Sequence, residues 1–209
     1  MALPEILSLP TNIGIASITI TAQNAVAISQ SPFTYAQQVI KHRGERWSAS
    51  ISLPPMLRVD AEPWVAFILA LGGPMRKFYL GDPNCKVPQG SAKTTAGTPV
   101  VNGADQTGAS LNVRGLPTSV TGYLKAGDYI QLGASATATL HKVLMDVDTD
   151  SSGTATLEIW PALRSATIDG ATIVLNNTVG RFRLSGNMQQ WQINDVSSYG
   201  ITFDCVEAL

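Results

Sequence analysis

Residues 46–56 read RWSASISLPPM, and this stretch together with the segment that follows it decides the fold class. From Trp47 to Leu53 every second residue is apolar, and serines fill the positions between them. Alternation with a period of two is typical of a strand that buries one face. Two prolines then follow, and since neither can donate a hydrogen bond to a neighbouring strand, the strand should end there. We expect the serines to face water or a neighbouring subunit.

Residues 59–74, VDAEPWVAFILALGGP, break the β pattern. Asp60 is placed to cap free amides, and Glu62 and Pro63 suit the first turn of a helix. The glycines at 72 and 73 supply a left-handed stop. The sequence therefore predicts one helix over about residues 61–71. Because this helix is apolar almost all round, we expect it to be covered on several sides and to pack over a sheet.

The composition changes over residues 88–110, where Pro, Gly, Ser, Thr, Ala and Asn dominate. Such a segment favours a crossing into a second module. Short β segments separated by turns follow it: LNVRGL (111–116), DYIQLG (128–133), ATLHKVLMDV (138–147), ATLEIWPAL (155–163) and ATIVLN (171–176). Five strands in this length indicate a small Greek-key barrel or sandwich, of which the OB-fold is the commonest five-stranded example.

The C-terminal segment alternates again, with Ile201, Phe203 and Cys205 on one face. We expect it to pair with the N-terminal sheet. The predicted fold is thus mainly β. Residues 1–86 and 181–209 should form a β-sandwich-like domain with the single helix, and residues 88–180 an inserted OB-fold-like barrel.

Charge and hydropathy exclude several classes of function. The 209 residues contain 14 Lys and Arg against 15 Asp and Glu, a net charge of −1. No global basic field is available to collect nucleic acid. The longest apolar run, from Trp64 to Leu71, is too short to cross a bilayer, so no membrane partner is expected. The first residues do not resemble a secretory signal, which favours synthesis in the cytoplasm. Cys85 and Cys205 show no metal-ligand spacing and are expected to be free thiols.

Catalytic signatures are missing from the sequence. The two histidines, His42 and His141, fall in different modules, and no GxSxG motif accompanies them. His42 lies in KHRGER, which we interpret as a polar hairpin turn. Neither GxxxxGK[ST] nor GxGxxG is present. We therefore expect no enzyme, no catalytic residue and no cofactor.

One acidic cluster has part of the ligand spacing of a calcium-binding loop. Asp146, Asp148 and Asp150 occupy positions 1, 3 and 5 of an EF-hand spacing. Position 6 is Ser151 instead of glycine, and Glu158 falls one position beyond the bidentate ligand. We interpret the segment as a hairpin with a DSSG turn between strands, and expect no metal site.

The order of these elements resembles the distal tail proteins of long-tailed bacteriophages, in the branch with an OB-fold-like inserted domain. The resemblance covers essentially the whole chain, and its most specific pieces are AGDYIQLG (126–133) and IWPAL (159–163). It rests on the following series of segments: RWSASISLPPM, DAEPWVAFILALGG, FYLGDP, LKAGDYIQLG, LEIWPAL, RFRLSGN and YGITFDCVEAL.

The resemblance implies a structural virion protein at the phage tail tip. Six copies would form a ring around the DNA channel through the terminal parts of the chain. The expected partners are other copies of the chain, the tail tube protein, the tail-tip hub and receptor-binding or fibre proteins. DNA would pass through the lumen without specific binding, and the segments around residues 13–21 and 47–53 are the candidate contacts between copies.

The alternative function is a carbohydrate-binding module of a phage or cell-surface protein. In that case Tyr123, Tyr129 and Trp160 would stack on sugar rings.

Overall fold

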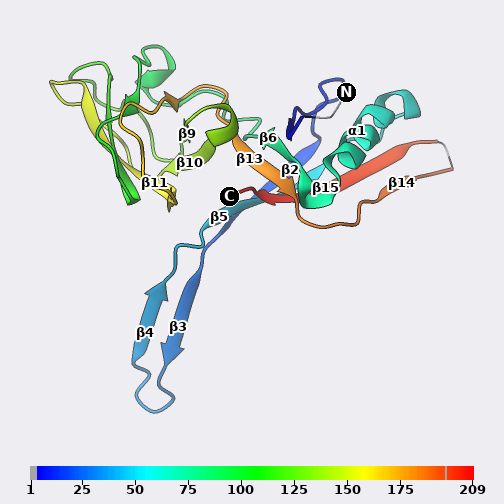
Figure 1. Ribbon diagram of the computed structural model, residues 1–209, viewed down its shortest axis with the longest axis horizontal. Helices are drawn as coiled ribbons and strands as arrows, with labels where there is room; N and C mark the ends of the chain where they lie inside the picture. Colours follow the sequence, from blue (N-terminus) through cyan, green and yellow to red (C-terminus); the bar gives the residue numbers. More distant parts are fainter. Residues whose placement is uncertain (1–3, 196) are drawn as a thin grey trace.

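The computed structural model describes residues 4–195 and 197–209, and it is mainly β with one α-helix and a barrel-like sheet, as predicted. The first sheet has seven strands (Figure 1). Six of them run side by side in the order β1 (Ile6–Leu7), β6 (Lys77–Leu80), β13 (Gly180–Leu184), β15 (Tyr199–Glu207), β5 (Arg46–Ser52) and β2 (Ser17–Gln23). The seventh, β14 (Trp191–Ile193), pairs with the beginning of β15.

The C-terminal segment joins the N-terminal sheet, which confirms that prediction. Strand β15 is antiparallel to β5, with Phe203 opposite Ile51 and Cys205 opposite Ala49. The predicted inward face of β15 is buried, with Ile201, Phe203 and Cys205 between 1% and 4% exposed.

Helix α1 (Arg58–Leu71) covers one face of this sheet. Its Trp64 and Phe67 rings pack against Phe203 and Phe78, with ring centroids 6.4 and 5.7 Å apart. The helix begins three residues before the predicted start, and Asp60 is not its cap. Leu57 holds the N-cap position, and no side chain donates or accepts a capping bond there. The left-handed Gly72 ends the helix as predicted, with its amide bonded to Leu69.

The helix is also less covered than predicted. Six of its side chains are buried, whereas Val59 and Leu69 are 82% and 59% exposed. The sheet lies on one side only, so an apolar stripe of α1 remains in contact with solvent. No helix among the described residues is long and apolar enough to cross a membrane.

The second sheet forms a nearly closed barrel. Its strands lie in the order β12 (Ile173–Val174), β9 (Tyr129–Leu132), β10 (Thr139–Val143), β11 (Thr154–Leu163), β8 (Gly108–Arg114) and β7 (Val100–Val101). Backbone bonds from Ile173 to Pro99 and from Val101 to Ala171, 3.0 and 2.9 Å long, join the two edges. Strand β7 was absent from the sequence prediction, which had five strands in this region. Short 3-10 turns lie at Gly73–Met75, Ser91–Lys93 and Ser135–Thr137.

Two buried clusters correspond to the two sheets. One lies between α1 and the first sheet, and the other fills the barrel around Leu111, Ile130 and Leu157. The first cluster also contains Tyr129 and Leu140 from the barrel strands, so the two cores meet.

Candidate assembly surface

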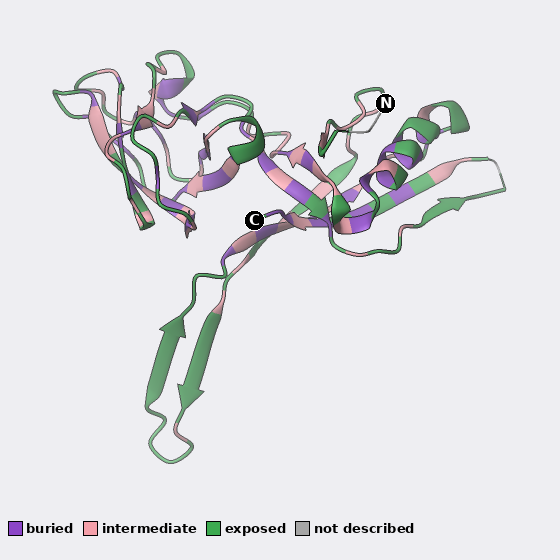
Figure 2. Cartoon of the chain, viewed as in Figure 1, coloured by how far each residue is buried: buried purple, intermediate pink, exposed green. Residues whose placement is uncertain are grey.

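A two-stranded hairpin projects from the body of the molecule, and we call it the arm. It consists of residues 26–41, with β3 (Val26–Gln30) antiparallel to β4 (Gln37–Lys41). The arm extends away from both the sheet and the barrel (Figure 1). Every residue of its two strands is exposed (Figure 2).

The arm continues two strands of the first sheet. Strand β2 leads into β3, and β4 leads into β5. Pairing stops at Gln23 opposite Arg46 and resumes at Val26 opposite Lys41, so two residues on one strand face four on the other. Unequal numbers of residues disrupt the ladder and bend a strand pair. The KHRGER segment is therefore this bend, and its prediction as a hairpin turn was wrong.

The true turn of the hairpin lies at residues 31–36. The Ser31 hydroxyl accepts bonds from the amides of Phe33 and Thr34, and the Tyr35 amide donates to the Ser31 carbonyl. The sequence carries a signal for this turn that our prediction did not use. Ser-Pro begins it, and two segments of equal length that contain β-branched residues flank it.

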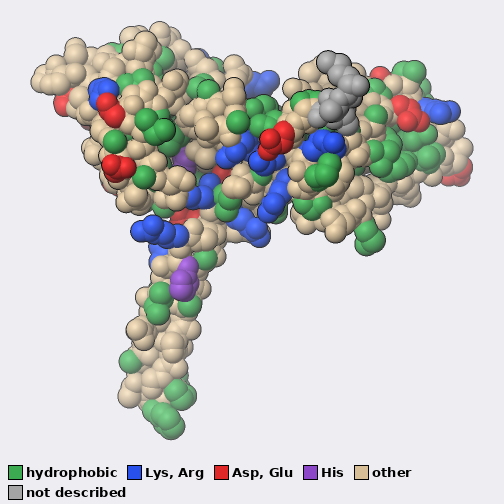
Figure 3. All heavy atoms as spheres, in the orientation of Figure 1, with side chains coloured by type: hydrophobic (Ala, Val, Ile, Leu, Met, Phe, Trp, Pro, Cys, Tyr) green, Lys and Arg blue, Asp and Glu red, His purple; other side chains and the backbone are tan. Residues whose placement is uncertain are grey.

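The arm carries exposed apolar side chains along its length. Phe33 and Tyr35 at the tip are 91% and 73% exposed, and Ile28 and Val39, which are register partners, are 64% and 59% exposed. Figure 3 shows apolar side chains at the tip, with no charged group beside them on this face. An isolated two-stranded hairpin is marginally stable in water. The arm is continuous with the first sheet, and it leaves these apolar side chains open to solvent.

The base of the arm is fixed to the barrel by ionic contacts. The Arg164 guanidinium donates to both carboxylate oxygens of Glu207, at 2.9 and 2.5 Å, and to the Glu45 carbonyl at 3.0 and 3.2 Å. The Glu45 carboxylate accepts from the Ala162 amide at 2.9 Å and pairs with Lys41 at 2.6 Å. Burial alone would raise the pKa of Glu45, but Lys41, the Ala162 amide and Arg164 hold this pKa below its ordinary value.

Aromatic contacts reinforce the same junction. The Trp47 and Trp160 rings meet edge to face at 4.4 Å. Trp47 donates its Nε1 hydrogen to the Leu140 carbonyl, and Trp160 donates to the Asn24 side chain, both at 2.9 Å. Strand β11 therefore holds Asn24 and Glu45 at the bend of the arm, and β10 holds Trp47 at the adjoining start of β5.

The face of the first sheet opposite α1 is polar. Thr19, Thr21 and the serines of β5 alternate with buried residues and lie on this face. Arg181 and Arg183 of β13 share it. Figure 3 shows Lys and Arg side chains gathered near the middle of the molecule, where arm, sheet and barrel meet.

Only one of the two predicted contact segments between copies lies at a sheet edge. Among the residues that the structure describes, strand β2 pairs with β5 alone, and β2 itself has no Lys, Pro or Asp to protect its other side. Strand β5 lies between β2 and β15, so its backbone is fully paired. Residues 47–53 therefore offer no free β edge, because β2 and the C-terminal strand occupy both sides of β5; that they contact another copy stays a prediction.

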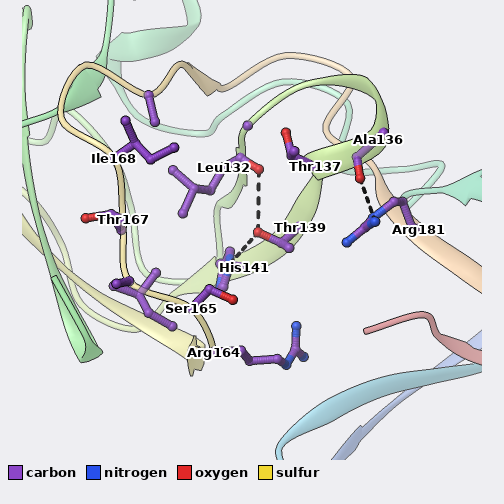
Figure 4. Close-up of a pocket in the computed structure, with 14 residues that line it drawn as sticks. Leu132, Ala136, Thr137, Thr139, His141, Arg164, Ser165, Thr167, Ile168 and Arg181 are labelled. Atoms are coloured by element: carbon purple, nitrogen blue, oxygen red, sulfur yellow. Dashed lines mark hydrogen bonds between the residues drawn. The ribbon is translucent and has the colours of Figure 1, made fainter. Parts of the chain in front are cut away.

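A pocket of about 420 Å³ opens beside the barrel (Figure 4). His141 lies in its wall and is 2% exposed. Its Nδ1 lies 2.7 Å from the Pro161 carbonyl oxygen. Because a carbonyl oxygen can only accept a hydrogen bond, Nδ1 carries the ring hydrogen. Nε2 lies 2.9 Å from the Thr139 hydroxyl oxygen and accepts its hydrogen. Burial lowers the pKa of His141 to about 4. Both ring nitrogens of His141 are therefore engaged in hydrogen bonds within the fold.

His42 lies at the bend of the arm, and its backbone amide donates to the Ala25 carbonyl.

The acidic cluster is divided among separate turns. Asp146 accepts from Lys125 and the Ala126 amide, and Asp148 accepts from the Gly122 amide. Asp150 accepts three bonds within its own turn, which is the predicted DSSG turn. The strand before it, β10, ends at Val143, so the predicted strand over MDV was wrong. Within residues 4–195 and 197–209, no three His, Cys, Asp or Glu side chains gather as they would around a metal ion.

The three aromatic residues assigned to sugar binding do not form a platform. Tyr123 and Tyr129 are 1% and 5% exposed, and burial raises the pKa of each to about 12. The Tyr123 hydroxyl donates to the Ala96 carbonyl, and Trp160 packs on Trp47. That assignment was wrong, because these side chains belong to the core and to the junction.

Neither a protein-family model nor a curated protein matches this sequence.

Proposed function

We propose that this chain is a structural subunit of a bacteriophage tail tip, where copies assemble into a ring around the DNA channel. The observation that carries the proposal is the arm, a projecting hairpin whose apolar side chains are exposed. The unprotected edge of β2 offers a second contact between copies. The resemblance to distal tail proteins supplies the biological setting.

The two faces of the first sheet suit a channel wall. Helix α1 covers the apolar face, and the opposite face presents Ser and Thr hydroxyls together with Arg181 and Arg183. Such a face, turned toward the lumen, would let DNA slide along its neutral hydroxyls, with Arg181 and Arg183 as the groups available for phosphate contacts. The barrel lies at one end of the molecule (Figure 1), where it can meet the tail-tip hub and receptor-binding or fibre proteins. The tail tube protein is the expected neighbour along the channel, and the tail tip of the virion is the expected location.

Light scattering coupled to size-exclusion chromatography tests this function, together with negative-stain imaging of the purified protein. We expect a mass of about six copies, as the resemblance implies, and a ring with a central hole. Replacing Ile28 and Val39 by serine should lower the mass, because both side chains are exposed on the arm. Met188→Ser is the control, since this side chain is 94% exposed but lies outside the arm.

A monomer at every attainable concentration would contradict the proposal. Binding to a glycan array by that monomer would instead favour the carbohydrate-binding alternative.

A further inference from the structure

The exposed stripe of α1 borders an apolar groove. The groove has a volume of about 700 Å³ and is lined by Leu57, Val59, Pro63 and Ala66. Leu57 and Val59 are 65% and 82% exposed. The groove also contains Arg58 and Glu62, which pair with each other at 3.1 Å. The two charged side chains at this apolar groove therefore neutralise each other.

The tip of the arm matches this groove in polarity. Residues 24–40 contain no Lys, Arg, Asp or Glu, and the tip presents Phe33 and Tyr35. The Ser31 hydroxyl and carbonyl bind the amides of the turn, so the tip is ordered before it meets a partner. Binding by an ordered loop avoids part of the entropy cost of association.

We propose that the arm tip of one copy docks in the α1 groove of the next copy, an inference that rests on the self-assembly proposed above. The arm tip and helix α1 of a single chain lie far apart (Figure 1), so the occupant must be a second chain. Contact between two different surfaces of identical chains is head to tail. Such contacts generate a ring when the rotation closes.

The surface area that the arm tip can bury is enough for part of a stable interface. Each buried aromatic side chain removes roughly 150–250 Å² from water, so Phe33 and Tyr35 together account for roughly half of the 800 Å² or so that a standard interface takes from each partner. Ile28 and Val39 lie further along the same arm and can extend the contact.

The pocket beside the barrel is a less suitable receptor for the tip. Arg164 and Arg181 line it, and their guanidinium groups bond to carbonyl groups and to Glu207. The arm tip has no carboxylate that could bond to these guanidinium groups in place of water. Covering them would therefore cost free energy without a compensating bond.

A mixing experiment tests the head-to-tail contact. The arm variant is Phe33→Ser with Tyr35→Ser, and the groove variant is Leu57→Ser with Val59→Ser. Each variant alone should have the mass of one chain in light scattering. A 1:1 mixture should give twice that mass and no more, because the intact groove of one variant accepts the intact arm of the other.

Controls separate this inference from the proposed function. All four replaced side chains are exposed, so circular dichroism and the thermal midpoint should match those of the parent protein. Ile168→Ser, at an exposed position in the barrel pocket, should keep the mass of the parent.

If the parent is oligomeric and the groove variant keeps its mass, or if the mixture stays monomeric, the arm does not dock on α1 although the ring proposal stands. Loss of mass in the Ile168 variant together with an oligomeric groove variant would move the contact to the barrel pocket. A monomeric parent would overturn both proposals.

Discussion

Glu207, two residues from the end of the chain, receives two hydrogen bonds from Arg164, at 2.9 and 2.5 Å. The carboxylate also accepts the amide hydrogen of Trp47 at 3.1 Å. Its side chain is 2% exposed and that of Arg164 is 19% exposed. One ion pair thus ties the last strand of the first sheet, the base of the arm and the end of β11 together.

Replacing Arg164 by methionine should destabilise the protein by about 3–5 kcal/mol, because Glu207 would remain buried without its partner. Denaturant unfolding measures this loss. Arg164→Met combined with Glu207→Leu should recover part of the stability, since no buried charge is then left unpaired. Arg114→Met is the matched control: its partner Asp169 is 48% exposed, so little change is expected. Equal losses at Arg114 and Arg164 would contradict the assigned role.

His141 should make the stability depend on pH. Burial lowers its pKa to about 4 in the folded protein, whereas the unfolded chain binds the proton with a pKa near 6.5. The unfolded state therefore gains protons first as the pH falls. The contribution is complete above about pH 6.5 and is lost progressively as the pH falls toward 4, with a total of roughly 3 kcal/mol.

Chemical denaturation between pH 8 and pH 4.5 measures this dependence, and His141→Gln should flatten it in that window. His42→Gln is the control, since His42 lies on an exposed stretch of chain. An unchanged slope in the His141 variant would mean that another group causes the effect.

The barrel should be removable as a unit. The chain leaves the first sheet after β6 and returns at β13, and Leu80 and Gly180 are register partners. A Cβ atom on Gly81 would lie 2.1 Å from the Thr178 carbonyl oxygen, so the two chain segments meet there. Joining Gly81 to Gly180 through a short Gly/Ser turn should leave a folded sheet domain.

The shortened chain should be less stable than the parent, because Trp47 loses both its Leu140 acceptor and its contact with Trp160. Circular dichroism and thermal unfolding report both properties. Complete insolubility beside a soluble parent would count against a division into two domains.

The ring proposal predicts weak binding of double-stranded DNA. The purified protein should show little affinity for it at physiological salt, as measured by fluorescence anisotropy. The oligomer should survive salt that screens surface ion pairs, because its contacts are apolar or made by the backbone. Tight and steeply salt-dependent binding would falsify the passive channel. In that case Arg181→Gln with Arg183→Gln would show whether the open face of the sheet is responsible.

Local patterns in the sequence predicted most of the regular structure correctly. The alternation after Trp47 and before Cys205 marks β5 and β15, since a half-buried strand requires a period of two. Gly72 ends α1 because its left-handed conformation, with φ of 62°, carries little penalty without a side chain. The predicted start of α1 was wrong by three residues, since Leu57 caps the helix without a side-chain bond and leaves no signal in the sequence.

Most of the candidate assembly surface, the arm in particular, could not be predicted from the sequence. Residues 26–41 contain ordinary strand formers, and nothing in their order says that no other layer covers them. Conversely, Tyr123 and Trp160 are aromatic residues of the kind that bind ligands. In the structure, however, Tyr123 is buried in the core and Trp160 packs against Trp47.

The sequence by itself therefore determined the strands β5 and β15, most of helix α1, the DSSG turn and which face of β5 and β15 is apolar, because these depend on residues near one another in the chain. The tertiary structure alone decided that the arm projects, that β5 is an inner strand and that Arg164 meets Glu207. These outcomes depend on pairing between segments far apart in the chain, and on the two unequal stretches between β2, β3, β4 and β5 that turn the arm away from the sheet.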